Sequence, residues 1–150
     1  MSSIKTEKSD YLNLYALMLI KNSYFDRAIE LSKKIISKEP DNYFALFHLG
    51  AAYRMKQQYD KSKHYLKHAI RVSYGNSILA YISLLDTCLF SEDVDCMDKY
   101  GKKLLSNFTL IRILDQLKEL EKENLTTPII QQSEIYLYLK KLSDEYYQKI

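Results

Sequence analysis

The same series of residues occurs twice between residues 9 and 76, with the second copy 34 positions after the first. Apolar and small residues recur at matching steps: Leu12 as Leu46, Tyr15 as Leu49, Ala16 as Gly50, Leu19 as Tyr53, Phe25 as Tyr59, Ala28 as Ser62 and Ile36 as Ile70. A fixed period between about 20 and 50 residues is typical of a solenoid, in which each unit buries its apolar face by stacking on a neighbour. The repeat therefore predicts a binding architecture and leaves the bound molecule unidentified.

Each copy has the spacing of two helices that fold back on each other. Leu12, Tyr15 and Leu19 lie three or four residues apart, and the same spacing resumes at Phe25 after a polar break at residues 21–23. We expect an all-α chain that forms a single domain. Its expected parts are repeats at about 9–42, 43–76 and 77–111 and C-terminal helices at about 109–123 and 128–148.

The composition argues against several other classes of protein. The chain has only three Gly and two Pro in 150 residues, which leaves little turn chemistry for β-hairpins or for a Rossmann-type loop. No run of about 18 apolar residues could span a membrane, and the polar start of the chain looks like neither a signal peptide nor a transit peptide. Cys88 and Cys96 are too few for a disulfide framework. We therefore expect reduced thiols, no membrane insertion and a cytoplasmic location.

The second copy resembles the tetratricopeptide repeat, a helix hairpin whose length matches the period found here. The residues that carry the resemblance are Leu46 in place of Trp, Leu49-Gly50, Tyr53, the aromatic Tyr59, Ser62 in place of the first Ala, and Ala69-Ile70. Small residues at these places let the paired helices approach closely. The resemblance implies a right-handed solenoid of about three antiparallel helix hairpins with C-terminal capping helices.

The third copy keeps the pattern only when one extra residue is allowed. Tyr81, Leu84 and Cys88 then fall at the expected places, whereas Leu85, Met97 and Leu104 stand where the family uses small residues. We therefore expect the third hairpin to pack more widely. On the last helix, the stripe Ile135, Leu139, Leu142 and Tyr146 suits a cap over the end of the solenoid.

In the resembled family, ligands lie along the concave surface made by the first helix of each hairpin. The matching positions that we expect to bind a partner are Asn13, Leu14, Leu17, Phe44, Phe47, His48, Ala51, Met55, Ile82, Ser83, Asp86 and Phe90. Many of these side chains are too apolar to be left in water unless something covers them. The chain's own helix at 107–123 is an alternative occupant of this groove.

The expected function is a non-enzymatic protein–protein interaction module that binds an apolar helical or extended segment of another protein. Heat-shock co-chaperones of this family clamp a C-terminal carboxylate with Lys, Asn and Arg. Here only Asn13 matches that set, so the clamp is absent. The small bacterial chaperones of type III secretion are similar in size and repeat number. They suggest a secretion chaperone as one version of this function.

No constellation of catalytic, cofactor-binding or metal-binding residues emerges from the sequence. His64 and His68 are four residues apart on a helix, but a zincin site would need a Glu beside the first His and a third ligand. A glycine-rich phosphate loop and a GxSxG nucleophile motif are both missing from the sequence. We therefore expect no enzyme, no cofactor and no metal.

Three alternatives stay open. The chain can be a structural subunit docked permanently in a larger assembly. Nucleic acid can bind the basic stripe at 54–71, although a solvated convex face explains that stripe more simply. Finally, the last helix has apolar residues beyond one face, which favours a homodimer or a docking surface there: Tyr136, Leu137, Tyr147 and Ile150.

Overall fold

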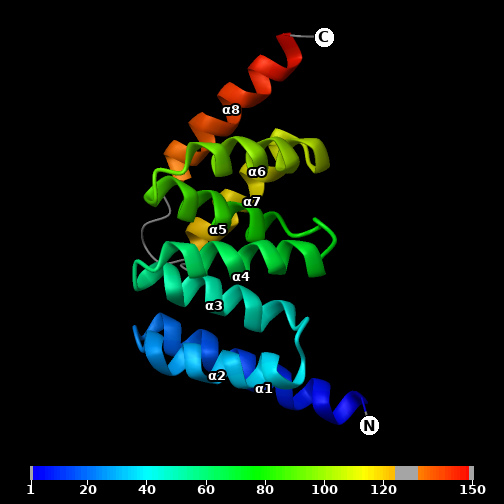
Figure 1. Cartoon of the computed structure of the whole chain (residues 1–150). Coiled ribbons are helices and arrows are strands. Elements are labelled where there is room, and N and C mark those ends of the chain that lie inside the picture. Colours follow the sequence, from blue (N-terminus) through cyan, green and yellow to red (C-terminus); the bar gives the residue numbers. More distant parts are fainter. Residues whose placement is uncertain (1, 124–131, 149–150) are drawn as a thin grey trace. The chain divides into compact units, whose positions relative to one another are not determined.

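The computed structural model describes residues 2–123 and 132–148, and this part of the chain is all-α (Figure 1). Its helices are α1 (Ser2–Lys21), α2 (Phe25–Lys38), α3 (Tyr43–Met55), α4 (Tyr59–Val72), α5 (Ile78–Phe90), α6 (Val94–Asn107), α7 (Leu110–Glu123) and α8 (Gln132–Gln148). Consecutive helices pack in pairs, as α1 with α2, α3 with α4, α5 with α6 and α7 with α8. The prediction of an all-α, tetratricopeptide-like fold is confirmed.

The chain divides into two compact units, residues 1–73 and residues 74–150. In the first unit, α1 packs against α2 and α3, and α3 packs against both α2 and α4. In the second unit, α5 pairs with α6, while α7 and α8 contact each other and both pack on α5. The single-domain organisation of residues 1–150 stays a prediction.

The turns inside the three hairpins share one backbone conformation. Each turn has a residue with positive φ that is not glycine, namely Ser23 at 66°, Gln57 at 61° and Glu92 at 55°. One residue after each of them, a backbone amide reaches back to the preceding helix. The three bonds are Tyr24 N to Leu19 O at 2.8 Å, Gln58 N to Tyr53 O at 2.9 Å and Asp93 N to Cys88 O at 2.9 Å. Gln57 follows Ser23 by 34 residues, and Glu92 follows Gln57 by 35 residues. This difference confirms the extra residue of the third repeat.

Small residues bring α3 and α4 together. A Cβ on Gly50 would lie 2.5 Å from Cγ of Leu66, and the Ser62 hydroxyl donates a 2.7 Å hydrogen bond to the Gly50 carbonyl. Beside this crossing, Ala28, Leu49 and Tyr53 belong to the core of the first unit. The prediction that Gly50 lies at a tight helix crossing is therefore confirmed.

The structure corrects the expectation of two reduced thiols. Cys88, near the end of α5, and Cys96, in the first turn of α6, are joined by a disulfide with a Cα–Cα distance of 6.0 Å. The hairpin turn lies between the two cysteines and brings the last turn of one helix against the first turn of the next. The expectation was wrong because it considered cysteine number and motif without this geometry.

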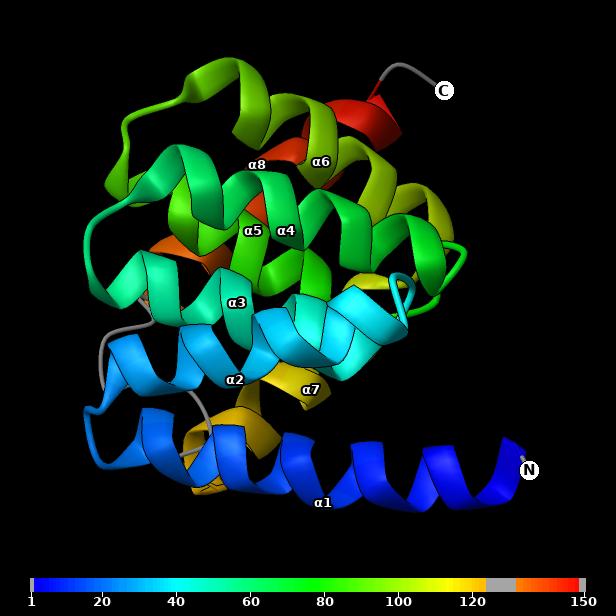
Figure 2. The same ribbon diagram turned by 60° about the horizontal axis from the view of Figure 1, so that its bottom comes forward.

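One helix begins earlier than expected, and the expected start of another is not tested. α1 begins at Ser2, ahead of the predicted repeat start at residue 9, and Figure 2 shows its first turns running on beyond α2. Residues 2–8 lack apolar periodicity, so periodicity alone could not predict a helix there. The predicted start of the last helix, with Thr127 as cap and Pro128 in the first turn, lies outside the described residues.

Candidate partner-binding face

A row of aromatic rings lies along the first turns of α3. Tyr43 meets Phe44 edge-on at 5.2 Å between ring centroids and stacks on Phe47 at 6.1 Å, and Phe47 meets His48 edge-on at 6.1 Å. We call Tyr43, Phe44, Phe47 and His48 the ring row. Edge-to-face and offset stacked pairs are the preferred geometries of aromatic side chains, so these contacts hold the rings in place.

The ring row is only partly covered by the rest of the chain. Phe44 keeps 57% of its surface exposed, Phe47 is half-buried, and His48 is buried, with only 5% of its surface exposed. Ala51 and Met55, which continue the same helix face, are also half-buried. Sequence reasoning found the other members of this face and missed Tyr43. Its spacing of four residues from Phe47 was the available signal.

On α1, which packs against α3, the expected site residues differ in exposure. Leu14 is 56% exposed, Leu17 is half-buried and Asn13 is only 5% exposed. The structure thus brings Leu14 and Leu17 to the surface of the helix beside α3. Asn13 instead lies inside the unit.

Asn13 fastens α1 to the start of α3. Its amide Nδ2 donates a 3.0 Å hydrogen bond to Oδ1 of Asn42, and the same oxygen accepts from the backbone amide of Ala45 at 3.0 Å as the N-cap of α3. One turn earlier on α1, the hydroxyl of Ser9 donates to the carboxylate of Glu39. The one residue that matched the carboxylate clamp of co-chaperones is thus already engaged within the chain.

His48 is a neutral side chain at the base of the face. Burial lowers the pKa of His48 to about 4, because a charged imidazolium would lose its hydration there. Its Nδ1 has no hydrogen-bond partner among the described residues. At neutral pH the ring therefore contributes apolar and edge-on contacts to Phe47 and carries no charge for an acidic ligand.

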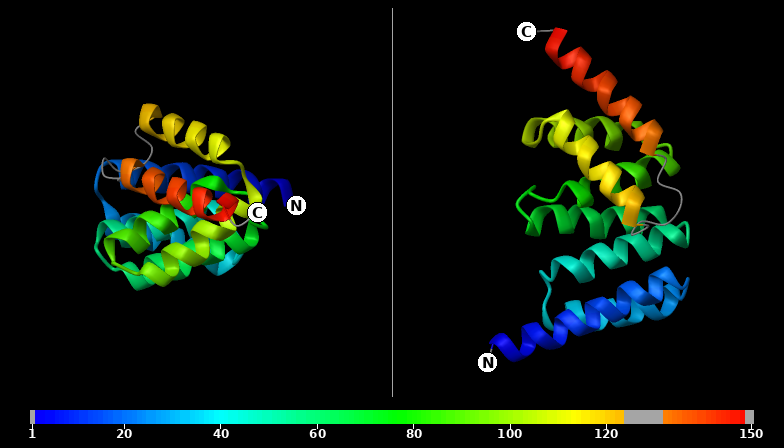
Figure 3. Two further views of the ribbon diagram at one scale, coloured as in Figure 1. Left: turned by 90° about the horizontal axis from the view of Figure 1, so that it is seen from above. Right: turned by 180° about the vertical axis from the view of Figure 1, so that it is seen from behind.

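The expected site residues of the second unit are mostly covered. Ile82 and Asp86 have no exposed surface, Ser83 is 6% exposed, and Phe90 is half-buried. Within this unit α7 and α8 both pack on α5, and Figure 3 shows α7 crossing α5 from behind. The alternative in which the chain's own helix occupies the face therefore has support at α5. The role of these four residues in partner binding stays a prediction.

Part of the basic stripe at 54–71 is engaged within the chain, while Arg71 is exposed. Arg54 and Lys63 are buried, with 8% and 9% of their surfaces exposed. Lys56 forms an ion pair with Asp26. Lys61 lies over the ring of Tyr53, with its Nζ 5.3 Å from the centroid. These engagements reduce the charge that a nucleic acid could meet.

The two histidines with metal-like spacing have other neighbours. Nε2 of His68 lies 3.2 Å from Oδ1 of Asp41, and the ring of His64 meets Tyr65 edge-on at 5.1 Å. Within residues 2–123 and 132–148 no three His, Cys, Asp or Glu side chains are grouped to hold a metal ion. In the same residues no helix is long and apolar enough to cross a membrane.

The last helix caps its own unit. Ile135, Leu139 and Leu142 are only 1%, 0% and 8% exposed, which confirms the predicted stripe for these three residues. The helix α8 packs on α6 and α7. A Cβ on Gly101 of α6 would lie 2.8 Å from Cδ1 of Leu142, so the glycine permits this close approach.

A half-buried tyrosine adds a polar contact between α8 and α6. The Tyr138 hydroxyl donates a hydrogen bond to Asp98. Burial, together with the Asp98 carboxylate, raises the pKa of Tyr138, which keeps the phenol protonated as the donor. Of the surplus apolar residues on α8, Leu137 is 63% exposed. Tyr146, Tyr136, Tyr147 and Ile150 have side chains outside the described part.

Comparisons with known proteins agree with this geometry. A tetratricopeptide repeat family model matches residues 24–64, which span α2, α3 and the start of α4. The match supports a tetratricopeptide repeat protein. Tetratricopeptide repeat protein 9C of Xenopus tropicalis is 30% identical over 89 residues, a match that covers 57% of this chain and 50% of the relative. The chain thus spans about half the length of that curated relative. Proteins with this repeat generally mediate protein–protein interactions.

Proposed function

We propose that the chain binds a segment of another protein on the face formed by the ring row of α3 and Leu17 of α1, without catalysing a reaction. The observation that supports this most directly is Phe44, a large aromatic side chain that stays 57% exposed beside ordered rings. Interfaces draw most of their binding energy from a few such anchors, because an aromatic ring supplies large contact area at a small loss of conformational freedom.

The chemistry of the face indicates what kind of segment it would accept. Phe44, Phe47 and Met55 offer apolar and adaptable surface, and the buried His48 ring is neutral. Asn13 is occupied by Asn42, so the face has no ready clamp for a terminal carboxylate. We therefore propose an apolar helical or extended segment as the ligand, held by side-chain burial.

A narrower role as a bacterial secretion chaperone would require an exported subunit as the partner. The relative from Xenopus tropicalis gives that version no support. A permanent structural subunit would differ from a transient adaptor by co-purifying with its assembly in fixed stoichiometry. The expectation of a cytoplasmic location rested partly on unpaired cysteines, and the bond between Cys88 and Cys96 removes that part of its support.

The test compares Phe44→Glu with Tyr74→Glu. Both replace an exposed aromatic residue by a carboxylate, and Tyr74, 88% exposed, lies in the loop after α4. Tagged wild-type and variant chains are incubated with extract of the source cells, and captured proteins are quantified by mass spectrometry. Phe44→Glu should lose at least about ten-fold of a partner that Tyr74→Glu retains, because the carboxylate would be buried unpaired in the complex.

Circular dichroism and melting temperature show whether each variant is folded. Because Phe44 is exposed in the free chain, its replacement should leave the melting temperature nearly unchanged. Equal capture by Phe44→Glu and wild type would contradict the proposed face. Phe47→Glu extends the test to a half-buried ring: a variant that unfolds or aggregates would assign Phe47 to the core instead.

A further inference from the structure

One side of α1 carries a row of large apolar side chains that lie open to solvent. Tyr11, Leu14, Tyr15 and Met18 are 76%, 56%, 47% and 54% exposed. Their spacing of three, one and three residues places them on one helix face. We call these four residues the α1 stripe.

The repeat shows that this face is normally an interior one. One repeat period carries the α1 stripe onto Ala45, His48, Leu49 and Ala52 of α3, which are 0%, 5%, 0% and 0% exposed. Leu49 and Ala52 belong to the core cluster with Ala28 and Ile29 of α2, so α2 covers this face of α3. The same face of α1 has no such cover among the described residues.

The side chains of the α1 stripe are unlike those of a solvent-facing cap. Terminal repeats need a polar outer face for solubility, and an exposed apolar row on a soluble surface marks an interaction site. The stripe also has Tyr11 and Met18 where α3 has Ala45 and Ala52. A helix could not approach α1 as closely as α2 approaches α3, so the occupant must interleave with bulky side chains.

We propose that the α1 stripe pairs with the same stripe of a second copy, with the two α1 helices antiparallel. In this arrangement Tyr11 of one copy faces Met18 of the other, and Leu14 faces Tyr15, so each bulky ring meets a flexible or aliphatic side chain. A two-fold axis makes every contact occur twice, as in other symmetric dimers. Tyr15 is held in position, since Arg27 donates a 3.0 Å hydrogen bond to its hydroxyl.

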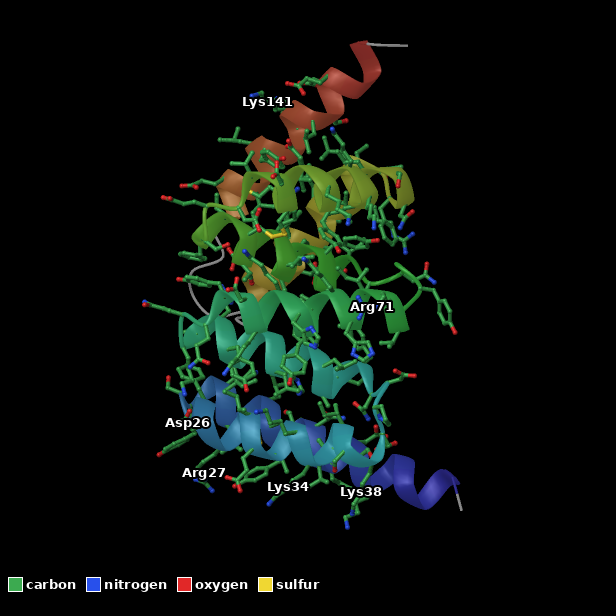
Figure 4. The ribbon with its side chains drawn as sticks, viewed as in Figure 1. Asp26, Arg27, Lys34, Lys38, Arg71 and Lys141 are labelled. Carbon is green, nitrogen blue, oxygen red and sulfur yellow. A yellow bond between two sulfur atoms is a disulfide. The ribbon has the colours of Figure 1, made fainter. Side chains whose placement is uncertain are left out.

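Charges beside the stripe fit an antiparallel pair. Asp10 and Lys21 are exposed at the two ends of the same flank, and neither has an ion-pair partner among the described residues. Antiparallel helices bring identical flanks together, so Asp10 of one copy meets Lys21 of the other at both ends of the stripe. A parallel pair would instead place the two copies of this flank on opposite sides of the contact, where their charges would not meet. Figure 4 shows Arg27, Lys34 and Lys38 extending from α2. Of these, Arg27 is bonded to Tyr15, which helical spacing places at the edge of the stripe away from Asp10 and Lys21.

The first test measures the mass of the full chain in solution by sedimentation equilibrium over a concentration series. We expect wild type to form dimers and Met18→Glu to weaken dimerisation by roughly 100-fold or more, because two carboxylates would be buried without partners. Leu137→Glu, an equivalent change at an exposed apolar residue of α8, should leave the dimer intact. Circular dichroism confirms that the variants stay helical.

The second test uses the charges to establish orientation. Asp10→Lys and Lys21→Asp should each weaken the dimer by about ten-fold, because each places like charges opposite each other twice. An equimolar mixture of the two variants should recover dimers, since all four opposed residues then form unlike pairs. Recovery should diminish as salt is added, because surface charge pairs are screened. A parallel dimer would be nearly insensitive to either variant.

Several outcomes would overturn the proposal. They are a strictly monomeric wild type, a dimer that Met18→Glu leaves unchanged, and a dimer lost in Leu137→Glu. Charge variants that dimerise like wild type, or a mixture that recovers no dimer, would overturn the antiparallel orientation. The outcome is separable from that of the proposed function. Phe44→Glu should remain dimeric while losing its partner, and Met18→Glu should retain the partner while becoming monomeric.

Discussion

The hairpin of α3 and α4 and the hairpin of α5 and α6 share one backbone plan but are closed by different means. Both consist of a 13-residue helix followed by a 14-residue helix. Both begin with an N-cap side chain, Asn42 or Ser77, that accepts a hydrogen bond from the backbone amide three residues later. Local structure is therefore almost the same in the two hairpins, whereas the residues between their helices are not.

The two hairpins exchange their large and small side chains at matching positions. Gly50 and Leu66 of the second hairpin correspond to Leu85 and Gly101 of the third. Gly50 lets α4 cross α3 closely, while Gly101 makes room for Leu142 of α8. The backbones of α3 and α4 accordingly come together over more of their length than those of α5 and α6.

The third hairpin has a covalent link where the second has a cation over a ring. Cys88 and Cys96 correspond to Tyr53 and Lys61, and Lys61 lies over the Tyr53 ring. The comparison teaches that a repeat can keep its turns and caps while close packing gives way to a disulfide.

The largest expected effect on stability comes from replacing Gly50 of the second hairpin by leucine, the residue at the matching position 85 of the third hairpin. Gly50→Leu should lower the free energy of unfolding by about 3 kcal/mol, because the added Cβ alone would lie 2.5 Å from Leu66 Cγ. Urea unfolding measures this change. The double variant Gly50→Leu/Leu66→Gly, which copies both residues of the third hairpin, should recover part of the loss.

The same unfolding curves test the single-domain prediction. One transition that shifts as a whole in Gly50→Leu agrees with it. Two transitions, of which only one moves, would mean that the units of residues 1–73 and 74–150 unfold separately. A Gly50→Leu variant as stable as wild type would remove the crossing as an explanation of the difference between the hairpins.

Breaking the covalent link should have the next largest effect. Reduction, or the variant Cys88→Ala/Cys96→Ala, should destabilise the chain by about 2.5 kcal/mol, since the bridge restricts a short loop of the unfolded chain. Denaturation with and without reductant measures the loss. Alkylation of unreduced protein followed by mass spectrometry is the control, and two labelled thiols would contradict the bond.

Acid should lower the stability of the second hairpin through His48, whose matching residue in the third hairpin is Ser83. The pKa of His48 is about 4 in the folded chain and about 6.5 when unfolded, so its contribution is present above pH 6.5 and is lost as the pH falls toward 4. At pH 5 the loss should be about 2 kcal/mol. His48→Ser copies Ser83 of the third hairpin and should lack this loss. Equal acid sensitivity of variant and wild type, measured by urea unfolding at pH 7 and pH 5, would exclude His48 as the cause.

Helix bounds and core stripes could be predicted from sequence because both follow from local periodicity. The repeat period, the extra residue of the third repeat and the Gly50 crossing were all readable in this way. The disulfide was not, since pairing depends on how a turn orients two helix ends. The role of Gly101 also escaped prediction, because its neighbour Leu142 belongs to α8, outside the repeat to which Gly101 belongs.

The candidate site was predictable as a helix face but not as a surface. Spacing places Asn13, Leu14 and Phe44 among groove positions, yet Asn13 is buried and hydrogen-bonded to Asn42 while Leu14 and Phe44 are exposed. Periodicity identifies which side chains share a face. Whether another element covers that face depends on contacts between residues far apart in the sequence, such as Ser9 with Glu39.

The extra residue of the third repeat lies in the loop between α4 and α5, where Tyr74 and Gly75 both have positive φ. This loop is fastened to the end of α6, because Asn107 Nδ2 donates to the Gly75 carbonyl at 3.3 Å. The peptide bond between Ser73 and Tyr74 precedes that attachment and ends the first unit. It is therefore a natural cut site for splitting the gene into two co-expressed fragments, for segmental isotope labelling or for inserting a reporter domain.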